Sequence, residues 1–146
     1  MENPSWLFVI ATAIAVVGIV IIFKQLISRV HEQGEKFESK KELASFLMKL
    51  AMVEGIPIVM IAFGMMQIME TTGIDYVIPL ILIFCFLLFG LIQIFLTRQQ
   101  VNNDPRTPEQ VKRLVSGYSI LGAAFASAFP IISIALIFMT QEFQTL

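Results

Sequence analysis

Four long apolar runs, separated by short polar segments, make up most of this chain. They cover Trp6–Phe23, Leu43–Met69, Tyr76–Leu96 and Leu114–Met139. Each run reaches the roughly 20 residues that a helix needs to cross a ~30 Å hydrocarbon layer, and none shows the period-two alternation of a barrel strand. The pattern predicts an all-α integral membrane protein of four transmembrane helices, arranged as two tandem helical hairpins over residues 1–70 and 71–146.

Composition supports a membrane protein and argues against several other classes. Of the 146 residues, 57% are hydrophobic and only 14% are charged, and the mean hydropathy is +0.81. A soluble domain of this size cannot bury so much apolar surface, so lipid has to cover the surplus. The sequence has no glycine-rich phosphate loop, no Cys/His metal spacing, no Ser/His/Asp set and no basic patch for nucleic acid. We therefore expect no cofactor, no metal, no nucleic-acid partner and no enzymatic activity of the chain by itself.

The basic residues are concentrated in two of the polar segments. Those between the first two runs are Lys24, Arg29, Lys36, Lys40 and Lys41, and those between the last two are Arg98, Arg106, Lys112 and Arg113. By the positive-inside rule, both long polar loops are cytoplasmic and both termini lie outside, in what we expect to be a bacterial inner membrane. The N-terminal segment lacks the basic residues of a cleavable signal, so we expect the first helix to be permanent.

Both of these loops contain turn signals. Gly34 is the predicted turn of the first loop, whose mixed charges are expected to prolong the flanking helices into water. In the second loop, Asn102–Pro105 is typical of a turn, and Thr107–Glu109 is typical of a helix start with a capping Thr followed by Pro. The loops are either solvated connectors or a docking surface for a cytoplasmic partner.

An internal duplication relates the second helix to the fourth. A shift of 73 residues superposes Pro57 on Pro130 and aligns two stripes of small residues at helical spacing. The stripes are Ala44, Ala51, Gly55 and Ala62 in the second helix, and Gly117, Ala124, Ala128 and Ala135 in the fourth. Small residues allow membrane helices to approach closely. We therefore expect these faces, together with Ala11, Ala15 and Gly18 of the first helix, to be helix-packing faces.

One acidic residue lies deep within the second apolar run. Glu54 is about 18 Å along a helix that starts near Glu42, which places it in the middle of the bilayer. A carboxylate at that depth is costly when charged and unpaired, so it is normally protonated, ion-bound or paired, and it marks an ion path or proton relay. Lys49 lies about 140° around the helix from Glu54 and is expected to extend its ammonium group toward the cytoplasmic interface.

Three further residues bear on this carboxylate. Pro57 removes a backbone hydrogen bond just beyond Glu54 and loosens the helix. Gln93 is the only amide well inside the third helix, and Ser127 occupies the position of the fourth helix that matches Glu54. Both are possible hydrogen-bond partners or ion ligands. The immediate neighbours of Glu54 offer no side-chain oxygen, and sodium needs several oxygen ligands, so a proton is the expected transported ion.

The segment Lys41–Val59, preceded by a small-residue helix and a charged loop, resembles the c (proteolipid) subunit of rotary ATP synthases. A hairpin of that family has a glycine- or alanine-rich first helix and a second helix whose mid-membrane carboxylate is often followed by proline. The matching positions are Ala11, Ala13, Ala15, Gly18, Glu54 and Pro57. A duplicated four-helix chain with one carboxylate further resembles the fused c subunits of V-type and some sodium-linked rotary enzymes.

This resemblance implies a function and a set of partners. It implies a homo-oligomeric ring in lipid, turning against a stator membrane subunit that supplies an arginine, with Glu54 binding and releasing one proton per chain. It also implies contact of the cytoplasmic loops with central-stalk subunits of an ATP synthase or ATPase.

The sequence also departs from the family. The carboxylate lies in the second helix, whereas Ser127 stands at its place in the fourth, where the fused subunits are expected to carry it. Two other interpretations therefore stay open. In one, the chain is a membrane scaffold or assembly protein in which Glu54 makes a fixed interhelical hydrogen bond. In the other, it is a small dimeric proton-coupled transporter.

Overall fold

The computed structural model of the chain describes residues 3–33 and 39–145, which form four long helices. These are α1 (Trp6–Gln33), α2 (Ser39–Glu70), α3 (Val77–Asn103) and α4 (Glu109–Thr145). All four are long and apolar enough to cross a membrane, and none of the described residues belongs to a β-strand. The prediction of an all-α chain with four helices long and apolar enough to span a membrane is thus confirmed for the described residues. The turn predicted at Gly34 and the charged residues Glu35, Lys36 and Glu38 lie outside the described residues.

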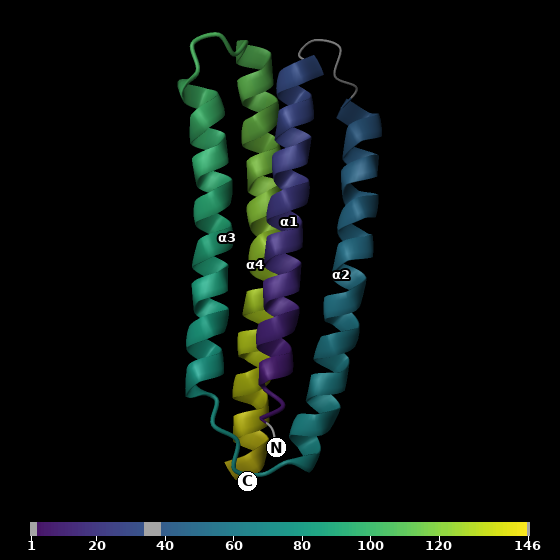
Figure 1. Cartoon of the computed structure of the whole chain (residues 1–146), viewed down its shortest axis with the longest axis vertical. Coiled ribbons are helices and arrows are strands. Elements are labelled where there is room, and N and C mark those ends of the chain that lie inside the picture. The colour runs from purple at the N-terminus through teal and green to yellow at the C-terminus, as the bar shows by residue number, and fades with distance from the viewer. Residues whose placement is uncertain (1–2, 34–38, 146) are drawn as a thin grey trace.

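The helices run alternately up and down along one long axis. The end of α1, the start of α2 and the connection from α3 to α4 lie at one end of the bundle (Figure 1). Both termini and the turn between α2 and α3 lie at the opposite end. The basic segments therefore share one end, which we call the charged end, as the positive-inside prediction requires. That this end is cytoplasmic stays a prediction.

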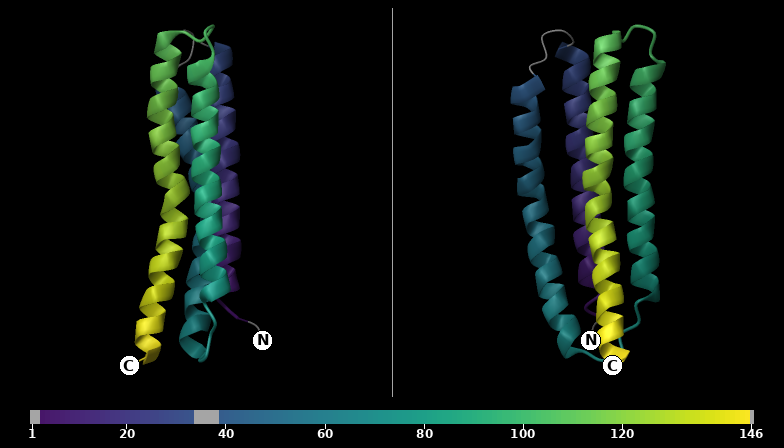
Figure 2. Two further views of the ribbon diagram at one scale, coloured as in Figure 1. Left: turned by 90° about the vertical axis from the view of Figure 1, so that its left-hand side faces the viewer. Right: turned by 180° about the vertical axis from the view of Figure 1, so that it is seen from behind.

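The bundle is organised around α1. This helix packs against α2, α3 and α4, and α3 also packs against α4. In contrast, α2 barely touches α4 and, over the described residues, makes no contact with α3. Figure 2 shows α2 and α3 on opposite sides of α1 and α4. More than half of the apolar stretch of α1 is buried, against less than a quarter of the stretches in α2 and α3. The packing on α1 thus joins the two halves of the chain.

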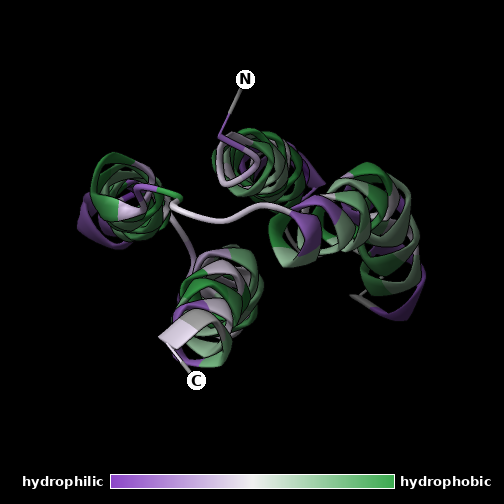
Figure 3. Ribbon diagram, turned by 90° about the horizontal axis from the view of Figure 1, so that it is seen from below, coloured by the Kyte–Doolittle hydropathy of each residue, from purple (hydrophilic) through white to green (hydrophobic). Residues whose placement is uncertain are grey.

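Large apolar side chains also cover the outside of the bundle. Met52 and Met69 of α2, for example, are 73% and 79% exposed. Seen along its axis, the bundle has hydrophobic residues on its outer as well as its inner surfaces (Figure 3). A soluble protein would not expose so much apolar surface, whereas lipid tails cover it without cost.

Buried apolar side chains form two clusters, one in each half of the bundle. The cluster nearer the charged end includes Ile19, Phe23, Leu26, Phe46, Leu50, Ile94 and Val115. The cluster nearer the termini includes Phe8, Ala15, Ile61, Ile83, Phe129 and Ile137. On α2 the two clusters are separated by the turns between Leu50 and Ile61. Glu54 and Pro57 lie in these turns, at the junction of the two clusters.

Glycines decide where the helices come closest to one another. A Cβ atom added at Gly18 of α1 would collide with Cγ1 of Val53 on α2. One added at Gly90 of α3 would lie 2.8 Å from Cγ1 of Val16 on α1. These glycines therefore let α2 and α3 approach α1 more closely than any larger residue would allow. Ala11 and Ala15 of α1 are also fully buried, so the predicted packing face of the first helix lies at helix contacts.

The small-residue stripes of the second and fourth helices lie elsewhere. Ala44, Ala51, Gly55, Ala62, Gly117, Ala124 and Ala135 are exposed, and Ala128 is half-buried. A Cβ added at Gly55 or Gly117 meets no atom within 4 Å. Within one chain the stripes thus make no close helix contact, contrary to the expectation for packing inside the bundle. Another face of α2 packs on α1 instead, where Val53 lies against Gly18 and Gly64 lies against Leu7 and Phe8.

Several positions of α2 and α4 related by the 73-residue shift share their burial. The pairs Phe46/Ser119, Pro57/Pro130 and Gly64/Ile137 are buried, and the pairs Ile58/Ile131, Ala62/Ala135 and Met66/Met139 are exposed, whereas Ile56 is exposed and its counterpart Phe129 is buried. The duplication stays a prediction. Since α1 contacts both helices, α2 and α4 present corresponding faces to it.

The connection between α3 and α4 follows the predicted turn but not the predicted cap. Asp104 accepts the backbone N–H of Arg106 at 2.9 Å, which closes the turn after α3. The hydroxyl of Thr107 is buried and has no hydrogen-bond partner among the described residues, so the expected capping bond is not formed. The reason is that the Thr107 side chain is directed inward and is only 6% exposed.

The glycine contacts yield a test of the packing. We expect Gly90→Leu to lower the free energy of unfolding by about 1–3 kcal/mol, because the added side chain has to displace Val16. Cys85→Leu, at an exposed small residue of the same helix, is the matched control and should leave stability nearly unchanged. Unfolding in detergent followed by circular dichroism measures both. Equal losses from the two variants would contradict the close approach of α3 to α1.

Candidate functional site around Glu54

Glu54 occupies the midpoint of α2, 15 residues after Ser39 and 16 before Glu70. The side chain is half-buried, and its Oε1 atom is buried without a hydrogen-bond partner among the described residues. An unpartnered carboxylate oxygen is costly to bury, and more so within a membrane. Glu54 therefore requires a proton, an ion or a partner from outside this chain.

The carboxylate lies at the edge of the contact between α1 and α2. Gly18 allows Val53, the residue before Glu54, to lie directly against α1. Leu50 and Pro57, one turn away on either side, are buried in the same contact. Around the helix, Glu54 lies between this packed face and the exposed small-residue stripe, to which Gly55 belongs. The carboxylate is thus placed between a tightly packed face and a face that another protein can approach closely.

Pro57 does not interrupt α2, which continues from Ser39 to Glu70. The proline has no N–H to donate, so the carbonyl of Val53 loses its usual intrahelical partner. This leaves a weakened turn of backbone beside the carboxylate. The matching residue of α4, Pro130, is likewise buried inside a continuous helix.

The structure does not bring Gln93 to Glu54. Gln93 is on α3, which has no contact with α2 over the described residues because α1 lies between them. Its amide oxygen accepts a hydrogen bond from the ammonium group of Lys24 on α1 at 2.8 Å. Within one chain, Gln93 is therefore a partner of Lys24 and not a ligand at Glu54.

Ser127 is not a partner of Glu54 within the chain either. Its hydroxyl donates to the backbone carbonyl of Ala124 at 3.0 Å, one turn earlier in α4. Lys49 is also elsewhere: it lines a small recess beside Arg29 and Glu42, which form an ion pair at 3.1 Å near the charged end. This placement agrees with the expectation that Lys49 extends toward the interface.

Two polar contacts were not singled out from the sequence. The hydroxyls of Thr12 on α1 and Ser133 on α4 meet at 3.2 Å in the buried centre of the bundle. His31 on α1 and Asp104 after α3 approach to 4.0 Å at the charged end. Hydroxyl residues are common in membrane helices and have no distinctive spacing, and these pairs join segments far apart in the sequence. No sequence signal could have identified them.

A single carboxyl group in this setting can bind and release one proton. No group of three or more His, Cys, Asp or Glu side chains that could hold a metal ion occurs in the described part of the chain.

Comparison of the sequence and structure with protein-family models, curated proteins and solved structures gives no match. The resemblance to rotary c subunits therefore depends on the residues alone.

Replacement of Glu54 by a nonpolar residue distinguishes a free carboxyl group from a fixed hydrogen bond. We expect Glu54→Met to leave the free energy of unfolding unchanged or to raise it, because a buried oxygen without a partner is removed. Ser127→Ala, at the equivalent position of α4, is the control and should have little effect. Chemical unfolding in detergent gives both values. A loss of about 1 kcal/mol or more for Glu54→Met would instead indicate a fixed interhelical bond.

Proposed function

We propose that this chain is a proton-binding rotor-ring subunit of the c type, working in a rotary ATP synthase or ATPase. Glu54 binds and releases one proton per chain, and the ATP chemistry takes place on other subunits. The observation that carries the proposal is the carboxylate oxygen at the midpoint of α2, which is buried without a hydrogen-bond partner among the described residues. A carboxyl group in this setting is suited to taking up and releasing a proton.

The position of α2 supports proton exchange at Glu54 rather than a fixed structural role for this residue. This helix is at the periphery of the bundle and contacts mainly α1. Its exposed stripe at Ala51, Gly55 and Ala62 lies next to the carboxylate and offers no bulky side chain. A neighbouring chain, or a stator subunit carrying an arginine, can therefore reach the carboxylate. A scaffold built on a hydrogen bond from Glu54 would need a partner for Oε1 within its own bundle.

The proposed assembly is a ring of identical chains in which the two tandem hairpins of each chain pack side by side. In it, the exposed stripes of α2 and α4 contact adjacent chains, and Gln93 or Ser127 of a neighbour can approach the carboxylate. The charged end faces the cytoplasm and contacts the central stalk. A bacterial inner membrane is the compartment that fits this arrangement.

Selective chemical labelling tests the proton site. We expect a hydrophobic carbodiimide to modify Glu54 at mildly acidic pH and to modify it progressively less as the pH rises, because the reagent requires a protonated carboxyl group. Mass spectrometry of peptides from the detergent-purified protein gives the extent of reaction at each residue. The exposed residue Glu70 is an internal control, since the reagent partitions into apolar surroundings.

The outcomes separate the interpretations. Protection of Glu54 by sodium would change the transported ion from a proton to sodium. Absence of reaction at Glu54 at every pH would exclude the rotor function. A Glu54→Gln variant should lose the modification while labelling at other residues stays unchanged.

The proposed ring predicts a specific effect at the exposed stripe. We expect Ala62→Leu to convert the oligomer largely to monomer, because a bulky side chain prevents close approach of a second chain. Ala62→Ser retains a small residue at the same position and should preserve the oligomer. Native mass spectrometry from mild detergent counts the chains in each complex. An unchanged oligomer in Ala62→Leu would show that the stripe is not the contact between chains.

A further inference from the structure

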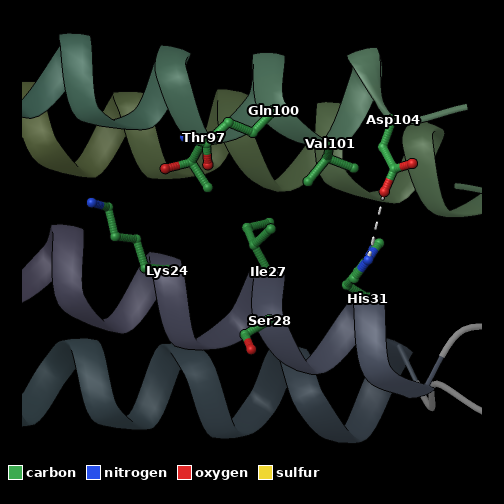
Figure 4. Close-up of a pocket in the computed structure, with 8 residues that line it drawn as sticks. All are labelled: Lys24, Ile27, Ser28, His31, Thr97, Gln100, Val101 and Asp104. Atoms are coloured by element: carbon green, nitrogen blue, oxygen red, sulfur yellow. Dashed lines mark ion pairs between the residues drawn. The ribbon is translucent and has the colours of Figure 1, made fainter. Parts of the chain in front are cut away.

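A polar cleft lies between α1 and α3 at the charged end of the bundle. It encloses about 360 Å³, within the range of roughly 300–1,000 Å³ usual for small-molecule sites. Figure 4 shows Lys24 of α1 extending toward α3 at one end of the cleft, with Thr97 and Gln100 on the facing helix. The ion pair of His31 and Asp104 lies at the other end. This cleft is separate from the Glu54 site, since α2 does not line it.

Lys24 brings a positive charge to the cleft that the protein does not neutralise. Its ammonium group donates to the amide oxygen of Gln93, which is a neutral acceptor. Among the described residues, no carboxylate lies within ion-pair distance of Lys24. An ammonium group has three N–H donors, so two remain for an anion. The amide of Gln100 can add another donor, whereas the hydroxyl of Thr97 already donates to the Gln93 carbonyl at 2.8 Å.

The depth of Lys24 matches that of lipid phosphates. The 18 residues from Trp6 to Lys24 span about 27 Å of helix, close to the ~30 Å thickness of the hydrocarbon layer. Trp6 is a typical residue for one membrane interface, which places Lys24 at the boundary of the opposite one. The phosphate groups of phospholipids begin at this level.

A lipid-facing apolar stripe leads directly to Lys24. Four exposed aliphatic residues precede it on the same face of α1 at spacings of three and four: Ile10, Ile14, Val17 and Ile21. This stripe is long enough to accompany an acyl chain. The positive charge of Lys24 and the apolar stripe below it thus match the two parts of a phospholipid, the phosphate at the interface and the acyl chain beneath it.

We propose that the cleft between α1 and α3 is a binding site for an acidic phospholipid. The phosphate accepts hydrogen bonds from Lys24 and Gln100, the rest of the headgroup extends toward His31 and Asp104, and one acyl chain lies along the stripe that ends at Ile21. Basic pockets between membrane helices on the cytoplasmic side are suited to such headgroups. This site does not depend on the function proposed for Glu54.

Native mass spectrometry of the detergent-purified full chain, titrated with phosphatidylglycerol, tests the site. We expect the first phosphatidylglycerol to bind about tenfold more tightly than phosphatidylcholine, because both lipids offer a phosphate to Lys24 but the choline cation cancels the negative charge that attracts the ammonium group. Lys24→Gln should remove the preference and Lys24→Arg should keep it. Lys41→Gln removes an exposed charge of α2 and is the matched control, which should bind like the unmodified chain. Gln100→Leu should weaken binding by a few-fold.

Several results would overturn the proposal. Equal binding of phosphatidylglycerol and phosphatidylcholine would show that the headgroup charge is not recognised. Equal losses from Lys24→Gln and Lys41→Gln would indicate diffuse surface charge. Displacement of phosphatidylglycerol by soluble glycerol phosphate at matching concentration would assign the cleft to a free phosphate compound. Equal binding of phosphatidylethanolamine would remove the preference for an acidic lipid.

Circular dichroism of each variant shows whether a loss of binding is due to unfolding. If Lys24→Gln does not fold, Gln100→Leu tests the site in its place.

Discussion

Apolar side chains gain nothing from leaving lipid for one another, so close approach of helix backbones has to stabilise this bundle. That approach occurs along α1, where Gly18 meets Val53 of α2 and Gly90 of α3 meets Val16. The other helices are arranged by their contact with this one helix. The pair of Thr12 and Ser133 adds a hydrogen bond between α1 and α4 at the buried centre. Both halves of the chain consequently contribute to each of the two buried clusters.

The same contact sets the environment of Glu54. Because Gly18 admits Val53, the next residue is held at the edge of the packed face, with one oxygen buried and without a hydrogen-bond partner in the described part of the chain. The residues of α2 that pack on α1 include Val53 and Gly64, and the small-residue stripe of α2 is left on the outside. The carboxylate is thereby placed next to the surface on which another chain can come closest. A single packing preference thus accounts for both the buried oxygen and the accessible stripe.

The prolines of α2 and α4 are packed alike, but the residues at the position of the carboxylate differ. Pro130 is buried as Pro57 is, and α4 presents to α1 the face that corresponds to that of α2. Ser127, however, stands where the carboxylate would be and bonds to its own helix. On α3, Gln93 accepts a hydrogen bond from Lys24 of α1, and Gln100 lines the cleft that Lys24 also lines. The proposed proton site and the proposed lipid site therefore lie on opposite sides of α1.

Much of the local structure was determined by the sequence alone. The apolar runs specified four helices because a bilayer leaves backbone groups no partner except one another. Spacing also placed Glu54 in the middle of a helix, since the rise per residue is fixed. The turn after α3 followed from Asp104, whose side chain bonds to the next backbone amides.

Only the tertiary structure decided which faces meet. The sequence suggested the stripe of Ala51, Gly55 and Ala62 as the contact, but α1 packs on another face of α2. It likewise suggested Gln93 as a partner of Glu54, whereas α1 lies between them and Lys24 takes the amide. Helical periodicity fixes which residues share a face, because that is a local property of the chain. Which neighbour covers a face depends on the shapes of all four helices together, and in lipid no difference in polarity marks the inner side.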